Sequence, residues 1–131
     1  MIYGIGVDIV SVSRFERWNR QPGLIERFFH SEDLMFARSA GTDFSRVLAS
    51  RFAVKEAFAK ALGSGFAGIS LKDITVRREQ NGKPFIVLFE SALRVFEKSG
   101  AQTVHLSLSH EKEYAIAFVI LEYPIKRENS P

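Results

Sequence analysis

Residues 44–62 read FSRVLASRFAVKEAFAKAL and decide the fold, because they form the longest uninterrupted helical segment of the chain. The segment contains neither proline nor glycine, Asp43 precedes it and Gly63 follows it, as expected at helix boundaries. At about 100° per residue, its apolar side chains cover a very wide arc. A helix that is apolar around most of its girth is a central, buried one.

Four charged residues interrupt this apolar helix. Arg51 and Lys55 fall inside the apolar arc, and Glu56 and Lys60 lie along one edge of it, four residues apart. Long basic side chains can extend to solvent, and a Glu–Lys pair at this spacing stabilises a helix by a few tenths of a kcal/mol. Burying unpaired charge costs several kcal/mol, however, so four such groups need partners. A polyanionic ligand with a metal ion would supply them.

The first strand carries another unusual charge. Residues 2–10 form an almost continuous apolar run, which is typical of a strand buried on both faces. Gly4 and Gly6 would weaken this strand unless something approaches its backbone closely. Asp8 could cap a nearby backbone group or bind a hard cation. With Glu56 it would make the two-carboxylate, water-rich site that Mg²⁺ prefers, although the sequence alone does not bring the two together.

The remaining elements predict the fold class. Further strands are expected over 70–78, 84–89, 103–109 and 114–122, and shorter helices over 13–20, 22–29, 32–40 and 91–99. This order predicts an α+β fold in which a mostly antiparallel sheet packs against the long central helix. We expect one domain over residues 1–123 and a frayed tail over 124–131.

A helix cap and a histidine on a strand are two further features of these elements. Ser31 is a candidate cap for the helix over 32–40, with Glu32 and Asp33 in its first turn, where acidic groups favour the helix dipole. His105 shares one face of its predicted strand with two serines. It is either a structural histidine or a contact to phosphate or water.

Composition excludes several classes of protein. The 131 residues include no cysteine, which excludes a disulfide framework, a thiolate metal site and a thiol nucleophile. No apolar run approaches the roughly 18–20 residues of a membrane span, and the N-terminus lacks a basic leader region, so we expect a cytoplasmic location. The net charge of +3 permits an acidic partner without demanding nucleic acid.

Three segments together resemble a known family, the holo-acyl-carrier-protein synthases, which are small 4′-phosphopantetheinyl transferases. They are Ile5–Val10 (IGVDIV), Arg51–Gly63 (RFAVKEAFAKALG) and Val104–His110 (VHLSLSH), and the turn Asn81–Pro84 (NGKP) also matches. The resemblance implies transfer of phosphopantetheine from coenzyme A to a serine of apo acyl-carrier protein in fatty acid biosynthesis, with release of 3′,5′-ADP. It also implies a 4′-phosphopantetheinyl transferase fold and a homotrimer with active sites between chains.

The resemblance further implies roles for individual residues. It makes Asp8 and Glu56 the Mg²⁺ ligands, Lys60 a pyrophosphate contact, Arg51, Lys55 and His105 contacts to the coenzyme's phosphates, Gly82, Lys83 and Pro84 the surroundings of the nucleotide, and Arg14 and Arg27 contacts to the carrier protein. Phosphoryl transfer rests mostly on positioning and on neutralising negative charge. Either Glu56 or a metal-held water would accept the proton of the acceptor serine.

Two other functions remain open at this point. A small basic nucleic-acid-binding domain would use the 12 Phe, 3 Tyr and 1 Trp. No basic cluster alternates with these aromatic residues, however, and most of the phenylalanines have core spacing. A non-catalytic trimeric relative is the second alternative, and the complete set of Asp8, Glu56 and Lys60 argues against it.

Overall fold

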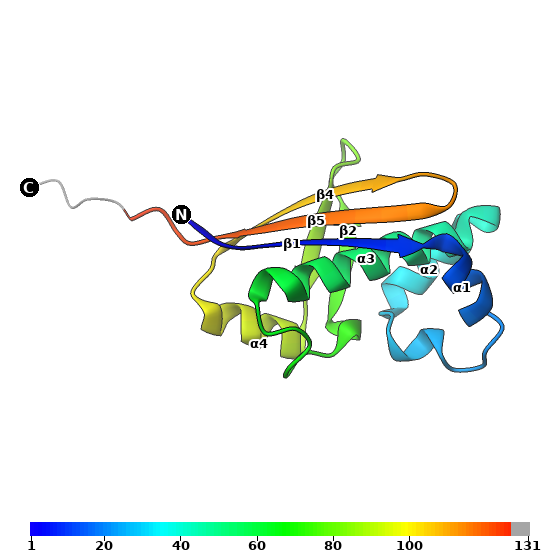
Figure 1. Ribbon diagram of the computed structural model, residues 1–131, viewed down its shortest axis with the longest axis horizontal. Helices are drawn as coiled ribbons and strands as arrows, with labels where there is room; N and C mark the ends of the chain where they lie inside the picture. The colour runs from blue at the N-terminus through cyan, green and yellow to red at the C-terminus, as the bar shows by residue number, and fades with distance from the viewer. Residues whose placement is uncertain (127–131) are drawn as a thin grey trace, which may run out of the picture.

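The computed structural model describes residues 1–126, so the predicted frayed tail over 124–131 lies mostly outside the described residues. Its helices and strands, in chain order, are β1 (Ile2–Ser11), α1 (Val12–Trp18), α2 (Ser31–Ser39), α3 (Phe44–Leu62), β2 (Ile74–Arg78), β3 (Pro84–Leu88), α4 (Glu90–Ser99), β4 (Thr103–His110) and β5 (Tyr114–Glu122) (Figure 1). Short 3₁₀ turns occupy Ile25–Arg27, Gly41–Asp43 and Leu71–Asp73.

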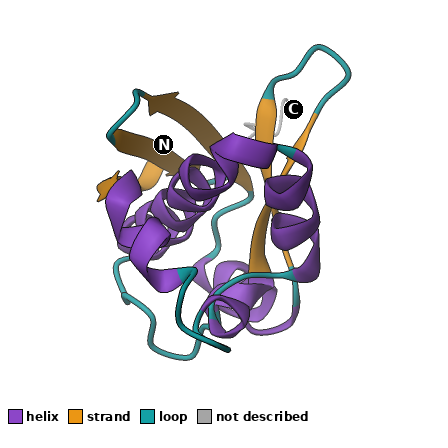
Figure 2. Ribbon diagram, turned by 90° about the vertical axis from the view of Figure 1, so that its right-hand side faces the viewer, coloured by secondary structure: helices purple, strands orange, loops and turns teal. Residues whose placement is uncertain are grey.

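The strands form two antiparallel groups. A three-stranded sheet in the order β1-β5-β4 lies along one side of α3, and β2 pairs with β3 in a separate hairpin (Figures 1 and 2). The predicted α+β class, with antiparallel sheet against a long central helix, is confirmed. None of the helices within residues 1–126 is long and apolar enough to cross a membrane.

Helix α3 forms the centre of the core. It contacts β1 and β5 on one side and α1, α2 and β2 on others, which is why its apolar arc is so wide. Leu48, Phe52 and Phe58 are buried along it. The helix ends at Gly63, whose φ of +81° is the left-handed conformation that glycine adopts at helix C-termini.

Strand β1 lies directly on α3 because two of its inward positions are glycine. A Cβ on Gly6 would lie 1.9 Å from the carbonyl oxygen of Ala57, and one on Gly4 would lie 2.0 Å from that of Ala61. Ala57 and Ala61 are one helical turn apart, so successive inward glycines of the strand meet successive turns of the helix. The two glycines therefore set the distance between strand and helix.

We expect Gly6→Ala to lower the free energy of unfolding by about 3 kcal/mol, because the added methyl group meets helix backbone that cannot rotate away. Urea unfolding followed by circular dichroism measures this. Lys98→Ala, on the exposed face of α4, is the control and should change stability by less than about 0.5 kcal/mol. An equally small effect of Gly6→Ala would contradict the close approach of β1 to α3.

The structure corrects two details of the sequence reading. The outward side chains Ile5, Val7 and Ile9 are 54–60% exposed, so burial of β1 on both faces is wrong for the single chain: within residues 1–126 these side chains on the outer face of the sheet are left open. The helix predicted over 22–29 is only the 3₁₀ turn Ile25–Arg27. Gly23 has a φ of +79°, which stops a helix from starting at Pro22.

Candidate active site

The inner face of β1 and the second half of α3 bring three charged residues together. The Nζ of Lys60 donates to Asp8 Oδ1 at 3.0 Å and to the carbonyl oxygen of Val7 at 3.0 Å. Asp8 points toward the helix because it follows Gly6 by two residues and so shares its strand face. The Lys60 side chain is about half exposed, and that of Asp8 is 17% exposed, so the pair borders solvent.

Glu56 lies one helical turn before Lys60 and therefore on the same side of α3. Burial raises the pKa of the Glu56 carboxyl, the nearby Asp8 carboxylate raises it further, and Lys60 and Arg14 only partly offset this. Two carboxylates that repel each other beside solvent are a site that a cation would stabilise.

A metal ion at this site would take few protein ligands. Within residues 1–126 no group of three or more histidines and acidic residues could hold a metal, so Asp8 and Glu56 would bind one as a pair. Mg²⁺ commonly binds through one or two carboxylates and keeps several waters or phosphate oxygens. The donors present therefore fit Mg²⁺.

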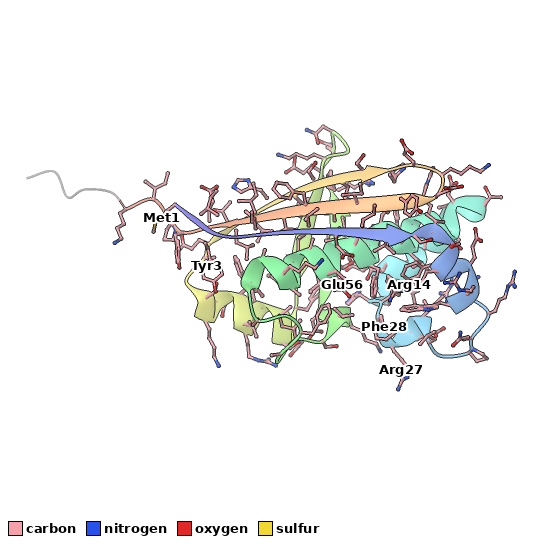
Figure 3. The ribbon with its side chains drawn as sticks, in the orientation of Figure 1. Met1, Tyr3, Arg14, Arg27, Phe28 and Glu56 are labelled. Carbon is pink, nitrogen blue, oxygen red and sulfur yellow. The ribbon has the colours of Figure 1, made fainter. Side chains whose placement is uncertain are left out.

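Arg14 of α1 borders this group. Its guanidinium carbon lies 4.6 Å from the centre of the Trp18 ring and 5.0 Å from that of Phe52, and its charge acts on Glu56. Figure 3 shows Arg14 close to Glu56, whereas Arg27 points away from the body of the fold. Arg27 is exposed in the turn after α1.

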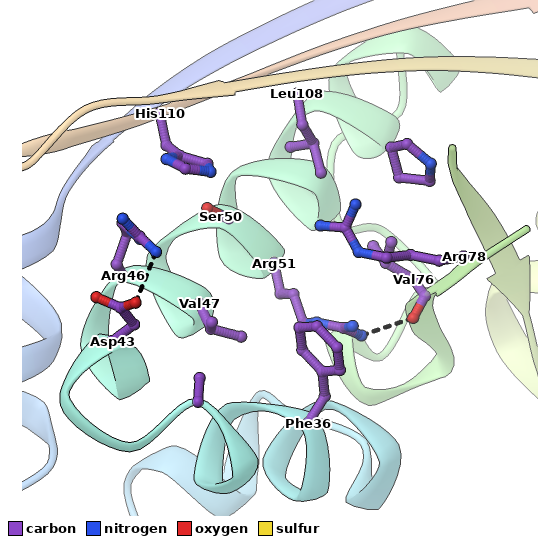
Figure 4. Close-up of a pocket in the computed structure, with 12 residues that line it drawn as sticks. Phe36, Asp43, Arg46, Val47, Ser50, Arg51, Val76, Arg78, Leu108 and His110 are labelled. Carbon is purple, nitrogen blue, oxygen red and sulfur yellow. Dashed lines mark hydrogen bonds and ion pairs between the residues drawn. The ribbon is translucent and has the colours of Figure 1, made fainter. Parts of the chain in front are cut away.

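A cavity of about 340 Å³ lies on another side of α3, between α2, the β2–β3 hairpin and the end of β4. Its charged lining residues are Asp43, Arg46, Arg51 and Arg78, and His110 also lines it (Figure 4). Phe36 and Pro84 contribute apolar surface to it. A cavity with three arginines and two flat apolar groups suits a ligand that combines phosphates with an aromatic base.

The predicted Gly82-Lys83-Pro84 turn lies at the rim of this cavity. Pro84 pairs with Arg78 across the hairpin, and Nη1 of Arg78 donates to the carbonyl oxygen of Gly82 at 2.9 Å. The turn thus holds one of the cavity's arginines in place. Lys83 is exposed, and its backbone N–H donates to Asn81 Oδ1 at 3.0 Å.

The two charged residues inside the apolar arc have protein partners. Arg51 and Lys55 are buried and both donate to the carboxylate of Asp33, at 2.8 Å and 3.0 Å. Burial lowers the pKa of the Lys55 ammonium, although Asp33 works against this. Lys55 lines no part of the cavity, whereas Arg51 does, so the structure brings only Arg51 to a place where a ligand could reach it.

His105 lies apart from both groups. It is exposed on the outer face of β4, opposite Ile120 of β5, and its ring contacts the carboxylate of Glu122. Within one chain it meets neither the cavity nor Asp8. A phosphate contact by His105 would therefore need a neighbouring chain.

Sequence reasoning missed several lining residues and one buried acid. Arg78 could have been found, because a hairpin turning at Asn81-Gly82 places it opposite Pro84. The role of Asp33 could not have been found, because an acidic residue in the first turn of a helix looks the same in sequence whether it is exposed or forms buried ion pairs. The expected Ser31 cap is also wrong, because His30 caps α2 through its ring nitrogen.

Comparison with known proteins gives one consistent result. A model of the 4′-phosphopantetheinyl transferase superfamily matches residues 4–119. The chain is 51% identical over 122 residues to a holo-acyl-carrier-protein synthase of Treponema denticola, which covers 93% of this chain and 99% of the relative. A second such synthase, from Trichlorobacter lovleyi, is 46% identical over 127 residues, with 95% of this chain and 100% of the relative covered.

Solved structures agree with these sequence matches. The crystal structure of the synthase from Neisseria meningitidis superposes with a TM-score of 0.85 at 39% identity, covering 93% of this chain and 99% of that one. The synthase from Bacillus anthracis, in complex with CoA (3′,5′-ADP), gives a TM-score of 0.79 at 36% identity and covers 95% and 99%.

Proposed function

Because the chain belongs to the 4′-phosphopantetheinyl transferase superfamily, we propose that it transfers 4′-phosphopantetheine from coenzyme A to a serine of apo acyl-carrier protein. The serine Oγ forms a bond to the phosphorus that bears pantetheine, the P–O bond to the adenosine 5′-phosphate breaks, and 3′,5′-ADP leaves. The observation that carries the proposal is the gathering of Asp8, Glu56 and Lys60 beside solvent, with the pKa of Glu56 raised by burial and by Asp8.

Each member of this group has a task in the proposed reaction. Asp8 and Glu56 would hold Mg²⁺, which supplies Lewis-acid stabilisation of phosphate oxygens when bound. Lys60 adds a positive charge where the leaving phosphate gains negative charge. Either Glu56 itself or a metal-held water would accept the proton of the attacking serine.

The cavity beside α2 would take the adenosine end of coenzyme A. Arg46, Arg51 and Arg78 supply positive charge there, and Pro84 supplies an apolar surface at the rim. Arg51 and Glu56 are five residues apart on α3, which is about 140° around the helix. One chain therefore presents the two groups on different sides of α3.

This separation supports active sites between neighbouring chains in a homotrimer. Asp8 is on β1 and the cavity borders β4, and these are the two edge strands of the sheet. The outer face of the sheet is apolar and exposed at Ile5, Val7, Ile9, Ile116 and Phe118. Chains packed through this face would bring one chain's β1 beside the next chain's cavity and would cover the apolar surface.

The carrier protein would dock beside Asp8 through Arg14 and Arg27. Acyl-carrier proteins are acidic, and complementary charge speeds the encounter of two proteins. The chain has no cysteine, which fits the reducing cytoplasm that we propose as its location, within fatty acid biosynthesis.

The direct test is intact mass spectrometry of apo acyl-carrier protein incubated with this chain, coenzyme A and Mg²⁺. We expect a mass gain of one phosphopantetheine group that EDTA prevents. Absence of any gain with several carrier proteins, from a folded sample, would overturn the proposed function. Salt-sensitive retention on DNA or RNA would then become the next measurement.

Charge reversal at the carrier surface should raise the KM for acyl-carrier protein by about tenfold in Arg14→Glu and by a smaller factor in Arg27→Glu, because the reversed charges repel an acidic partner. Steady-state kinetics at low and high salt measures this, and the difference from wild type should shrink at high salt. Arg94→Glu on α4, at the opposite end of the molecule from α1 (Figure 1), is the control. An unchanged carrier KM in Arg14→Glu would refute its assignment.

Assembly should depend on the outer face of the sheet. We expect light scattering to give three times the 14.8 kDa mass of one chain, and Val7→Lys to give a single-chain mass with activity lost. Charge at the centre of an apolar interface is left unpaired when chains associate, which opposes association. A monomeric wild type that remains fully active would rule out active sites shared between chains.

A further inference from the structure

A fully buried carboxylate, that of Asp33, joins α2 to α3 and to the β2–β3 hairpin. Its Oδ1 accepts from Arg51 Nη1 at 2.8 Å and from Thr75 Oγ1 at 2.5 Å. Its Oδ2 accepts from Lys55 Nζ at 3.0 Å and from the backbone N–H of His30 at 3.0 Å. Four donors on two oxygens leave the carboxylate one orientation.

Lys55 completes this cluster and has no donor left for a ligand. Its Nζ also donates to the carbonyl oxygens of Leu71 and Ile74. An ammonium has three N–H groups, so all of its donors are used inside the protein. Lys55 therefore anchors the carboxylate, whereas any effect on a ligand must pass through Arg51.

Arg51 is held by one of its nitrogens and open at the others. Nη1 also donates to the carbonyl oxygen of Val76 at 2.7 Å (Figure 4), so both of its hydrogens are used. Within residues 1–126, Nε and Nη2 make no hydrogen bond, and no buried side-chain nitrogen lacks a partner. These two nitrogens are therefore not completely buried, although Arg51 as a whole is only 6% exposed, and they are the donors that Arg51 has left for a ligand in the cavity that it lines.

Helix α2 fixes the Arg51 guanidinium from a second direction. Phe36 follows Asp33 by three residues and so lies on the same face of α2. Its ring centre is 4.6 Å from the guanidinium carbon of Arg51 (Figure 4). One helix thus supplies an anion to the edge of the guanidinium and an aromatic ring to its plane.

We infer that Asp33 is a positioning residue for the nucleotide end of the coenzyme A site, holding Arg51 so that its open N–H groups face the phosphates of the ligand. The inference rests on the proposed function and assigns Asp33 no contact with substrate. Without this carboxylate, Arg51 loses its charged anchor, and its open N–H groups lose their fixed direction into the cavity.

The test compares binding of 3′,5′-ADP, measured by isothermal titration calorimetry, with steady-state KM values for both substrates. Asp33→Asn keeps the shape of the side chain and removes its charge. We expect its Kd for 3′,5′-ADP and its KM for coenzyme A to rise about tenfold or more, with the carrier-protein KM unchanged. The reason is that Arg51, no longer held by a carboxylate, loses the alignment of its charge-assisted hydrogen bonds to the ligand. Arg51→Ala should show the same loss, and Asp33→Asn should add little to it in the double variant.

Matched variants separate positioning from general damage. Glu32→Gln breaks the exposed pair with Arg77 in the same turn of α2 and should leave the Kd for 3′,5′-ADP unchanged. Thr75→Val removes one hydrogen-bond donor to Asp33 but keeps the charges of Asp33, Arg51 and Lys55. It should therefore raise the Kd by a smaller factor than Asp33→Asn does. It replaces Asp33→Asn as the deciding variant if that chain does not fold.

Each outcome decides the matter. A folded Asp33→Asn chain, or failing that Thr75→Val, that binds 3′,5′-ADP as tightly as wild type overturns the inference. Equal rises in the KM values of both substrates also overturn it, because they indicate general damage. A wild-type chain that transfers no phosphopantetheine refutes the proposed function instead, so the two failures are distinguishable.

Discussion

Glu56→Gln is expected to lower kcat/KM for phosphopantetheine transfer by at least about 100-fold while leaving the affinity for 3′,5′-ADP within twofold of wild type. The amide keeps the size of the carboxylate but loses the negative charge that would hold Mg²⁺ and the basicity that would accept the serine proton. Asp8→Asn should act in the same direction, and in both variants half-maximal activity should require more Mg²⁺. Rates by intact mass spectrometry across a Mg²⁺ titration provide the measurement.

The control for this prediction is Glu97→Gln, an exposed glutamate on α4. It should leave both the rate and the Mg²⁺ dependence unchanged. A Glu56→Gln chain that turns over normally would remove Glu56 from both roles. A chain that loses activity but keeps the wild-type Mg²⁺ dependence would leave it the role of base alone.

Asp33→Asn is expected to lower the free energy of unfolding by about 3–5 kcal/mol at neutral pH, because it leaves Arg51 and Lys55 buried without their anion. Burial alone would raise the pKa of the Asp33 carboxyl, but the Lys55 charge and the hydrogen bonds from Thr75, Arg51 and Lys55 outweigh it, so the pKa lies below its ordinary 3.8. A carboxyl whose pKa is lowered by folding stabilises the fold above its unfolded pKa. That contribution is lost as the pH falls through the folded value.

The stability difference between wild type and Asp33→Asn should therefore be largest above pH 4 and should shrink in more acidic solution. Urea unfolding at a series of pH values measures it. Asp43→Asn is the matched control, because it breaks an exposed pair with Arg46 at 2.8 Å and should cost less than about 1 kcal/mol. A difference that is the same at pH 3 and pH 7 would mean that Asp33 stabilises the fold by shape and not by charge.

Much of the fold could be predicted because the deciding signals are local. The extent of α3 follows from residues 44–62 and the glycine after them, and both ends agree with the structure. The β2–β3 hairpin follows from Asn81-Gly82 between two apolar segments. Gly4 and Gly6 already indicated a close approach to the first strand, and only the structure identified α3 as the partner.

The candidate site could be predicted only in part, because its contacts join distant parts of the chain. The contact between Asp8 and Lys60 joins residues 52 positions apart, and their association in one site was an expectation drawn from family resemblance. Arg51 and Lys55 looked equivalent in sequence because both fall inside the apolar arc. Both donate to Asp33 on another helix. They differ because two backbone carbonyl groups take the remaining N–H groups of Lys55, whereas only one accepts from Arg51, and helical spacing cannot reveal this.

Strand β1 also has a consequence for how this sequence can change over evolutionary time. Its inward positions are Gly4 and Gly6, which the close approach of α3 requires, then Asp8, which the proposed chemistry requires, and the buried Val10. Its outward positions Ile5, Val7 and Ile9 look permissive in a lone chain, but in the proposed assembly they become interior. An edge strand of a small domain normally tolerates many substitutions, but in this assembly β1 would tolerate almost none.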